Sequence, residues 1–299
     1  MSKIFYTLSL PAHLKDNNRP VRLVGMDSQK STDSISTGDR MSENSRSHPR
    51  AGSWFYLGMA VAISVTAFTG FVFTYFGPVL RGQYPAVSPF VHVHGWSFFA
   101  WYLLLPLQAL LITAGRRRVH MTLGGASVLL AIVMVFTGIL VAAVRIEQGL
   151  STEDPNELTL FWRGFGQLIM FNMLPFAVFY TAAIVHRRKP DLHKRLMILA
   201  SASALPAAIF RIIVGFGGFY WLATPAWVMP AAFLLPAVFI VIGMIRDHLS
   251  RGAVHRIYIV GLVIVVVVHG TGLAVVGTPT GEALSRIMAG FARLFGWLY

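Results

Sequence analysis

Seven long apolar runs decide which folds this chain can adopt. Each run holds 19–26 residues, and a helix needs about 20 apolar residues to cross the hydrocarbon layer of a bilayer. The runs cover residues 54–77, 89–114, 121–144, 160–185, 196–221, 227–245 and 257–278. Because backbone polar groups within a bilayer must be satisfied inside their own segment, these runs predict an all-α membrane protein with a bundle of seven transmembrane helices over 54–278.

The overall composition agrees with a polytopic membrane protein. Hydrophobic residues make up 55% of the chain and charged residues only 12%, whereas a soluble domain carries about 25% charged residues. The chain contains no cysteine, so disulfides, thiolate metal sites and cysteine catalysis are excluded.

The basic residues fall on alternate sides of the predicted spans. Nineteen of the 25 Lys and Arg residues lie in the N-terminal tail and in the second, fourth and sixth connections, whereas the third connection is acidic. This alternation predicts a cytoplasmic N-terminus and an external C-terminus in the cytoplasmic (inner) membrane. The net charge of +13 then reflects the orientation of the spans in the membrane and attraction to anionic membrane lipids. It does not predict nucleic acid as a partner.

Both ends of the chain differ from the spans. Residues 1–53 are polar and contain no apolar segment of the signal-peptide type, so they predict a disordered cytoplasmic tail, with Met41 as an alternative start. Within 279–299, apolar residues recur at three- and four-residue steps opposite Arg286 and Arg293. This pattern predicts an amphipathic helix on the outer membrane interface.

Four polar side chains from four predicted helices fall at one depth in the outer half of the bundle. At about 1.5 Å per residue, His94, Gln167, Arg211 and His269 lie about 8–15 Å below the outer ends of their helices. Ionisable groups in a span usually face the bundle interior, so these residues are candidate cofactor-binding groups. No acid falls within the seven runs, and Arg211 therefore requires a carbonyl, water or a bound anion as its partner.

A second polar set lies at the inner ends of the spans. Gln108, His120 and His193 belong to it, and both histidines stand beside Arg and Lys clusters, where contact with water or lipid headgroups is the alternative to a ligand role. On regular helices His94 and Gln108 share one face, as do His193 and Arg211, which are eighteen residues apart. We therefore expect inner and outer polar groups along common helix faces.

Three motifs follow one another along spans two to five. They are His94-Gly95 with Pro106 and Gln108 downstream, His120-x-x-Leu123-Gly124, and His193-Lys194-Arg195-Leu196-Met197 with Arg211 eighteen residues after the histidine. Together they resemble a family of bacterial multi-pass membrane proteins, classed by a domain of unknown function, with His…Pro-x-Gln, His-x-x-Leu-Gly and His-[Arg/Lys]-Arg-x-Met…Arg helices. The resemblance covers about residues 90–215, although this chain has Lys194 and Leu196 where the family often has Arg and Trp. It implies that His94, Gln108, His120, His193 and Arg211 form a recurrent polar set, and it brings no established activity.

The first functional hypothesis is electron transfer with b-type haem or a quinone. Haem in a helical bundle needs axial ligands, usually histidines, from facing helices. His94 with His269 is the candidate outer pair of iron ligands, and His120 with His193 is the candidate inner pair. Arg211 would hold a haem propionate, and a quinone or a redox protein would be the partner.

Two other classes of function stay open. One is a non-catalytic assembly factor, regulator or lipid-binding scaffold, in which the polar residues serve packing and headgroup contact. The other is a small-molecule transporter, although the chain has no evident inverted repeat and no acid within its seven apolar runs. A hydrolase or transferase is disfavoured because the sequence offers no acidic pair, Ser-His-Asp set or H-E-x-x-H motif.

Overall fold

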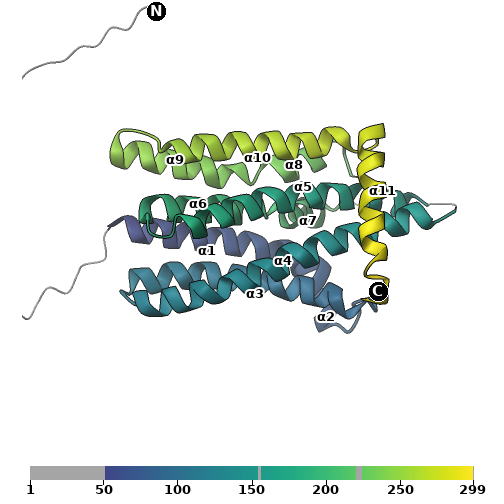
Figure 1. Cartoon of the computed structure of the whole chain (residues 1–299), viewed down its shortest axis with the longest axis horizontal. Helices are drawn as coiled ribbons and strands as arrows, with labels where there is room; N and C mark the ends of the chain where they lie inside the picture. Colours follow the sequence, from purple (N-terminus) through teal and green to yellow (C-terminus); the bar gives the residue numbers. More distant parts are fainter. Residues whose placement is uncertain (1–50, 154–155, 220–223, 299) are drawn as a thin grey trace, which may run out of the picture. The chain divides into compact units, whose positions relative to one another are not determined.

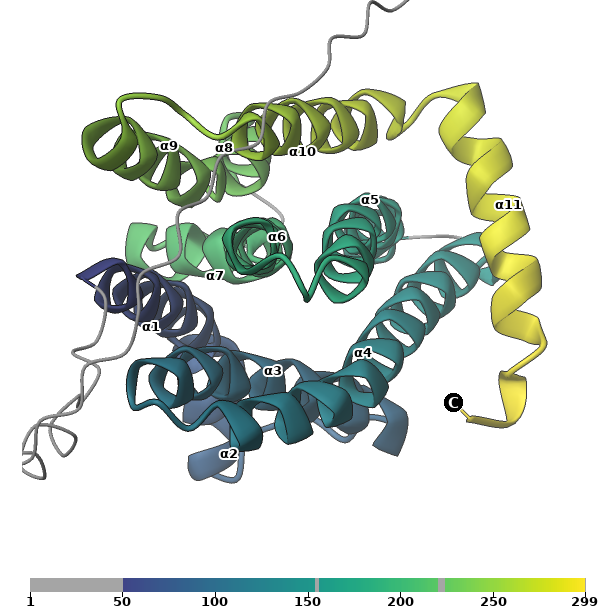
Figure 2. The ribbon, with the colours of Figure 1, turned by 60° about the vertical axis from the view of Figure 1, so that its left-hand side comes forward.

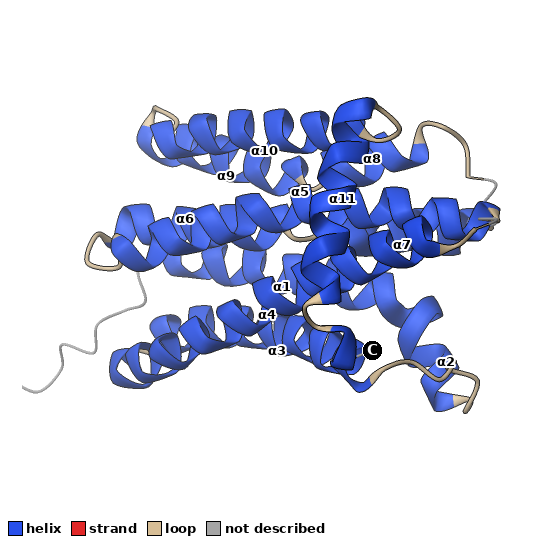
Figure 3. Ribbon diagram, turned by 45° about the vertical axis from the view of Figure 1, so that its right-hand side comes forward, coloured by secondary structure: helices blue, strands red, loops and turns tan. Residues whose placement is uncertain are grey.

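The computed structural model describes residues 51–299 except 154–155, 220–223 and 299, so the predicted tail lies almost wholly outside the described residues. The described part is helical, with no strand in it (Figure 3). Its long helices are α1 (Ala51–Phe71), α3 (Pro89–Thr113), α4 (Arg117–Ser151), α5 (Glu157–Val185), α9 (Ala237–Arg251) and α10 (Arg256–Val275). The shorter ones are α2 (Gly77–Leu80), α6 (Pro190–Ser203), α7 (Pro206–Gly217), α8 (Val228–Leu234) and α11 (Pro279–Arg293), with a π-helical turn at Val72–Phe76 and a 3₁₀ turn at Gly296–Leu298.

Six helical segments in the described residues are long and apolar enough to cross a membrane. They are Ser53–Leu80, Pro89–Thr113, Arg117–Ser151, Thr159–Val185, Val228–Arg251 and Arg256–Val275. The protein therefore has the architecture of a multi-pass membrane protein. As expected for helices surrounded by lipid, many large apolar side chains are exposed on their outer faces, among them Leu103, Leu129 and Val263.

The predicted span at 196–221 is not one straight helix. It corresponds to α6 and α7, which are bent by 46° relative to each other at the break between Ser203 and Pro206. Proline has no N–H and its ring clashes with the preceding turn, which ends a regular helix. A common face for His193 and Arg211 requires one unbroken helix, so the break between α6 and α7 removes the basis for that prediction.

The helices form three layers when viewed nearly along their axes (Figure 2). α5, α6 and α7 lie in the middle, α3 and α4 cover one side, and α8, α9 and α10 cover the other. α1 packs against both α3 and α7. Close approach of α1 to α7 requires glycine at position 70, because a Cβ there would overlap the backbone of Ala208.

The core lies between the layers and is largely aromatic. Trp101 from α3 packs edge-on against Phe176 and Tyr180 from α5, with ring centroids 5.0 and 5.2 Å apart. The Trp101 indole N–H donates to the hydroxyl of Ser201 in α6 at 3.2 Å, and the Tyr102 hydroxyl donates to the carbonyl of the same serine at 3.2 Å. These two hydrogen bonds fix the register of α3 against α6.

The C-terminal helix α11 runs across one end of the bundle, crosswise to the long helices (Figure 1). The face it buries carries Gly281, Ser285, Met288 and Ala292, whereas Ile287 and Leu294 are exposed. The buried stripe therefore includes small residues that the apolar periodicity did not select. The position of α11 at a membrane interface stays a prediction.

Candidate functional site: an inner histidine pair

Three of the predicted inner residues meet at one end of the bundle. His120 lies in the first turn of α4, His193 in the first turn of α6, and Gln108 near the end of α3. The imidazole rings of His120 and His193 are 6.4 Å apart between centroids and nearly perpendicular, at 87°. Both histidine residues are partly buried.

The Gln108 amide fixes the hydrogen-bonding state of His120. We assign the amide with its oxygen toward Gly124, because the reverse orientation would set the amide nitrogen against the Gly124 N–H and the amide oxygen against the His120 carbonyl. In the assigned orientation the oxygen accepts from the Gly124 N–H at 2.9 Å, and the nitrogen donates to His120 Nδ1 at 2.8 Å and to the His120 carbonyl at 3.2 Å. A histidine nitrogen that accepts a hydrogen bond carries no proton. The neutral His120 ring therefore carries its proton on Nε2.

His193 has the opposite arrangement. Its Nδ1 lies 2.9 Å from the carbonyl oxygen of Ala183 in α5, and a carbonyl can only accept. The proton of neutral His193 therefore sits on Nδ1, which leaves the Nε2 lone pair available. The pair thus presents one donor nitrogen, on His120, and one acceptor nitrogen, on His193.

In the outer set, His94 and Arg211 lie near each other. His94 Nδ1 is 3.4 Å from the hydroxyl of Thr137 in α4, and the positive charge of Arg211 acts electrostatically on the His94 ring. Arg211 donates to the carbonyl of Ala207 at 2.8 Å and lies 4.7 Å from the ring centroid of Phe71. A carbonyl, one of the three kinds of partner that we expected, is thus present.

The other two outer residues have different partners. The buried Gln167 amide donates to the carbonyl of Gly281 at 3.0 Å and to the hydroxyl of Ser285, which ties α5 to α11. The buried His269 lies with Nδ1 2.9 Å from the carbonyl of Phe233 in α8. Among the hydrogen bonds of the described residues, each of the four side chains has its own partners, and none bonds to another member of the set.

A buried ion pair, which the apolar runs and motifs did not predict, joins α6 to α9. Arg195 donates from Nε and from its second guanidinium nitrogen to the two carboxylate oxygens of Asp247, at 2.8 and 2.5 Å. Both residues lie in predicted connections between apolar runs, whereas α6 already begins at Pro190 and α9 continues to Arg251. One feature of the sequence could have indicated the ion pair. The predicted inner connections contain only two acids, Asp191 and Asp247, among many bases.

The candidate haem ligands fit a haem only in part. α3, which carries His94, and α10, which carries His269, lie on opposite sides of the middle layer (Figure 2). The inner pair has a spacing that would admit a shared iron, and the His193 lone pair suits it. The His120 ring does not suit iron, because its unprotonated nitrogen is already engaged by Gln108. No group of three or more His, Asp or Glu residues arranged for a metal occurs within the described residues.

Comparisons of the chain with models of known families, with curated proteins and with solved structures give no match.

Proposed function

We propose that this multi-pass membrane protein binds a quinone or its quinol at the inner pair of His120 and His193. The observation that carries the proposal is the complementary state of the two imidazoles, with a donor Nε2–H on His120 and a free acceptor Nε2 on His193. A quinone ring bears carbonyl oxygens that accept hydrogen bonds, and a quinol bears hydroxyls that donate them. One donor and one acceptor together match both forms.

The surroundings support this choice of ligand. Both histidines lie in the first turn of their helices, close to the ends of the apolar segments. An amphiphilic molecule with a polar ring and an apolar tail can reach such a position from the lipid phase. Each imidazole is also held in orientation by a second group, Gln108 for His120 and the Ala183 carbonyl for His193, as a preorganised binding site requires.

Haem is disfavoured relative to the quinone by the hydrogen bonding of His120. Two axial histidines must both direct a lone pair at the iron. In the neutral His120 ring that lone pair is on Nδ1, which accepts from Gln108, and Nε2 carries the proton.

We also propose the finer topology of seven spans, with the bent pair α6 and α7 as the fifth. Support comes from the alternation of basic connections, which six spans would break. Because the chain has no cysteine, single replacements can be labelled selectively. In intact cells, an impermeant maleimide should label Ser151→Cys and leave Ser250→Cys unlabelled. The reverse pattern would overturn the orientation.

Lipid extraction and an absorbance spectrum test the proposed function together. Protein purified with its native lipids should carry quinone well above the membrane average, and the His120→Phe and His193→Phe variants should lose this enrichment. His248→Phe is the matched control, because His248 is exposed on α9. A haem absorbance band that disappears in the same two variants would instead establish haem, and equal quinone in all four proteins would refute a site at this pair.

A further inference from the structure

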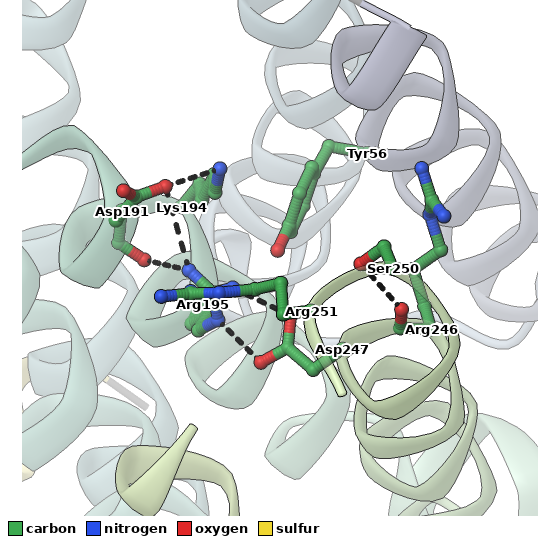
Figure 4. A pocket seen from close by; sticks show the side chains of 8 residues that line it. All are labelled: Tyr56, Asp191, Lys194, Arg195, Arg246, Asp247, Ser250 and Arg251. Atoms are coloured by element: carbon green, nitrogen blue, oxygen red, sulfur yellow. Dashed lines mark hydrogen bonds and ion pairs between the residues drawn. The ribbon is translucent and has the colours of Figure 1, made fainter. Parts of the chain in front are cut away.

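A crevice lined by basic side chains opens between α1, α6 and α9 (Figure 4). Its volume is about 250 Å³, room for roughly eight water molecules. The lining residues are Tyr56, Asp191, Lys194, Arg195, Arg246, Asp247, Ser250 and Arg251. Four bases and two acids thus face one small space.

Both acids in the crevice already have basic partners. Asp247 is held by Arg195 in the buried ion pair, and Asp191 lies 2.6 Å from the ammonium of Lys194. The Lys194 ammonium also lies 4.8 Å from the ring centroid of Tyr56, which keeps it at the wall of the crevice. The positive charge that remains belongs to the two arginines of α9.

Arg246 and Arg251 lie on α9 at the same crevice, and neither has a carboxylate within ion-pair distance among the described residues. The guanidinium of Arg246 lies 5.6 Å from the ring centroid of Phe55, and such stacking holds it in place. A planar guanidinium donates two parallel hydrogen bonds to a phosphate. The surplus charge and the donor geometry therefore suit a phosphate group.

Large apolar side chains are exposed close in sequence to the lining residues, on two of the three helices that bound the crevice. Trp54 on α1 is 56% exposed, and Ile245 and Leu249 on α9 are 54% and 76% exposed. A soluble anion gains nothing from such neighbours, whereas the acyl chains of a phospholipid do. We propose that the crevice binds the phosphate of an anionic phospholipid headgroup, with Arg246 and Arg251 as the principal contacts. This site is separate from the histidine pair and does not depend on the quinone proposal.

The test measures binding of phosphatidylglycerol to the full-length protein in a neutral detergent. Arg246→Gln with Arg251→Gln removes the two free bases, and Arg116→Gln with Arg118→Gln is the matched control, since it removes two exposed bases from a different connection at the same end of the bundle. Removing two bases that contact an anionic lipid at the membrane surface should raise the dissociation constant for phosphatidylglycerol about 30-fold. We expect that loss in the crevice variant and a much smaller loss in the control.

Two further measurements distinguish a lipid phosphate from free inorganic phosphate. Phosphatidylcholine at the same concentration should bind far more weakly, and inorganic phosphate should not displace phosphatidylglycerol. Equal losses in the two double variants would overturn the site in favour of general surface charge. Displacement by inorganic phosphate at equal concentration would overturn the assignment to lipid. Circular dichroism of both variants should match the wild type, and Arg246→Lys with Arg251→Lys should restore part of the affinity.

Discussion

Replacing Asp247 with alanine should destabilise the protein more than almost any other single change at the inner end. The side chains of Arg195 and Asp247 are only 2% and 3% exposed. The substitution would leave the buried Arg195 guanidinium with the carbonyl of Asp191 at 2.5 Å and, as its remaining ion-pair partner, the exposed Asp191 carboxylate at 3.7 Å. It would also remove the acceptor of the His255 backbone N–H, which lies 3.2 Å from Asp247.

The expected loss in the free energy of unfolding follows from the burial of the Arg195 charge that remains. Removing one partner of a buried ion pair costs about 3–5 kcal/mol. At about 2–4 °C per kcal/mol for a protein of this size, the midpoint of thermal unfolding should fall by about 6–20 °C. Tryptophan fluorescence of the purified protein during heating provides the measurement.

Two controls separate the ion pair from general damage. Asp191→Ala removes an acid that is 69% exposed, and it should cost no more than about 1 kcal/mol. Replacing Arg195 with Met together with Asp247 with Leu leaves no buried charge, so this double variant should recover most of the lost stability. The reasoning is refuted if Asp247→Ala shifts the midpoint no more than Asp191→Ala, or if the double variant is as unstable as Asp247→Ala.

Two further predictions concern the packing of α10 and its first turn. Gly243→Ala should lower the unfolding midpoint, because the new Cβ would lie 2.5 Å from the ring of Tyr258, whereas Gly270→Ala, with no atom within 4 Å of its Cβ, should leave the midpoint unchanged or raise it. Stability should also fall as the pH drops below about 6.5, since burial, together with nearby arginines, lowers the pKa of His255, and its neutral Nδ1 accepts from the Ile257 N–H at 3.2 Å. The unfolded state binds the extra proton, and His255→Asn, which retains an N-cap acceptor, should weaken this pH dependence in thermal unfolding measured from pH 5 to 8.

The sequence predicted the helical membrane architecture because apolar run length is a property of single segments. Six of the seven predicted runs correspond to single helical segments that could span a membrane. The bend between α6 and α7 was not predicted, although Pro206 marks the break. A proline inside an apolar run is compatible with both a kink and a full break, and packing against neighbouring helices decides between them.

Which polar residues meet was harder to predict than their depth. Gln108, His120 and His193 were correctly grouped by depth, and their rings and amide do lie together. His94 and His269 were grouped by the same argument, yet their helices belong to different layers (Figure 2). Depth constrains one coordinate only, and the order of helices around the bundle depends on tertiary packing that a single sequence does not reveal.

Titration of the purified protein with a short-chain ubiquinone tests the central claim most directly. Quenching of tryptophan fluorescence should be saturable in the wild type and in His248→Phe. The loss of one hydrogen bond to the ligand should weaken binding about tenfold in His120→Phe and in His193→Phe. Equal affinity in all four proteins, or no saturable binding by the wild type, would contradict a quinone site at the pair formed by His120 and His193.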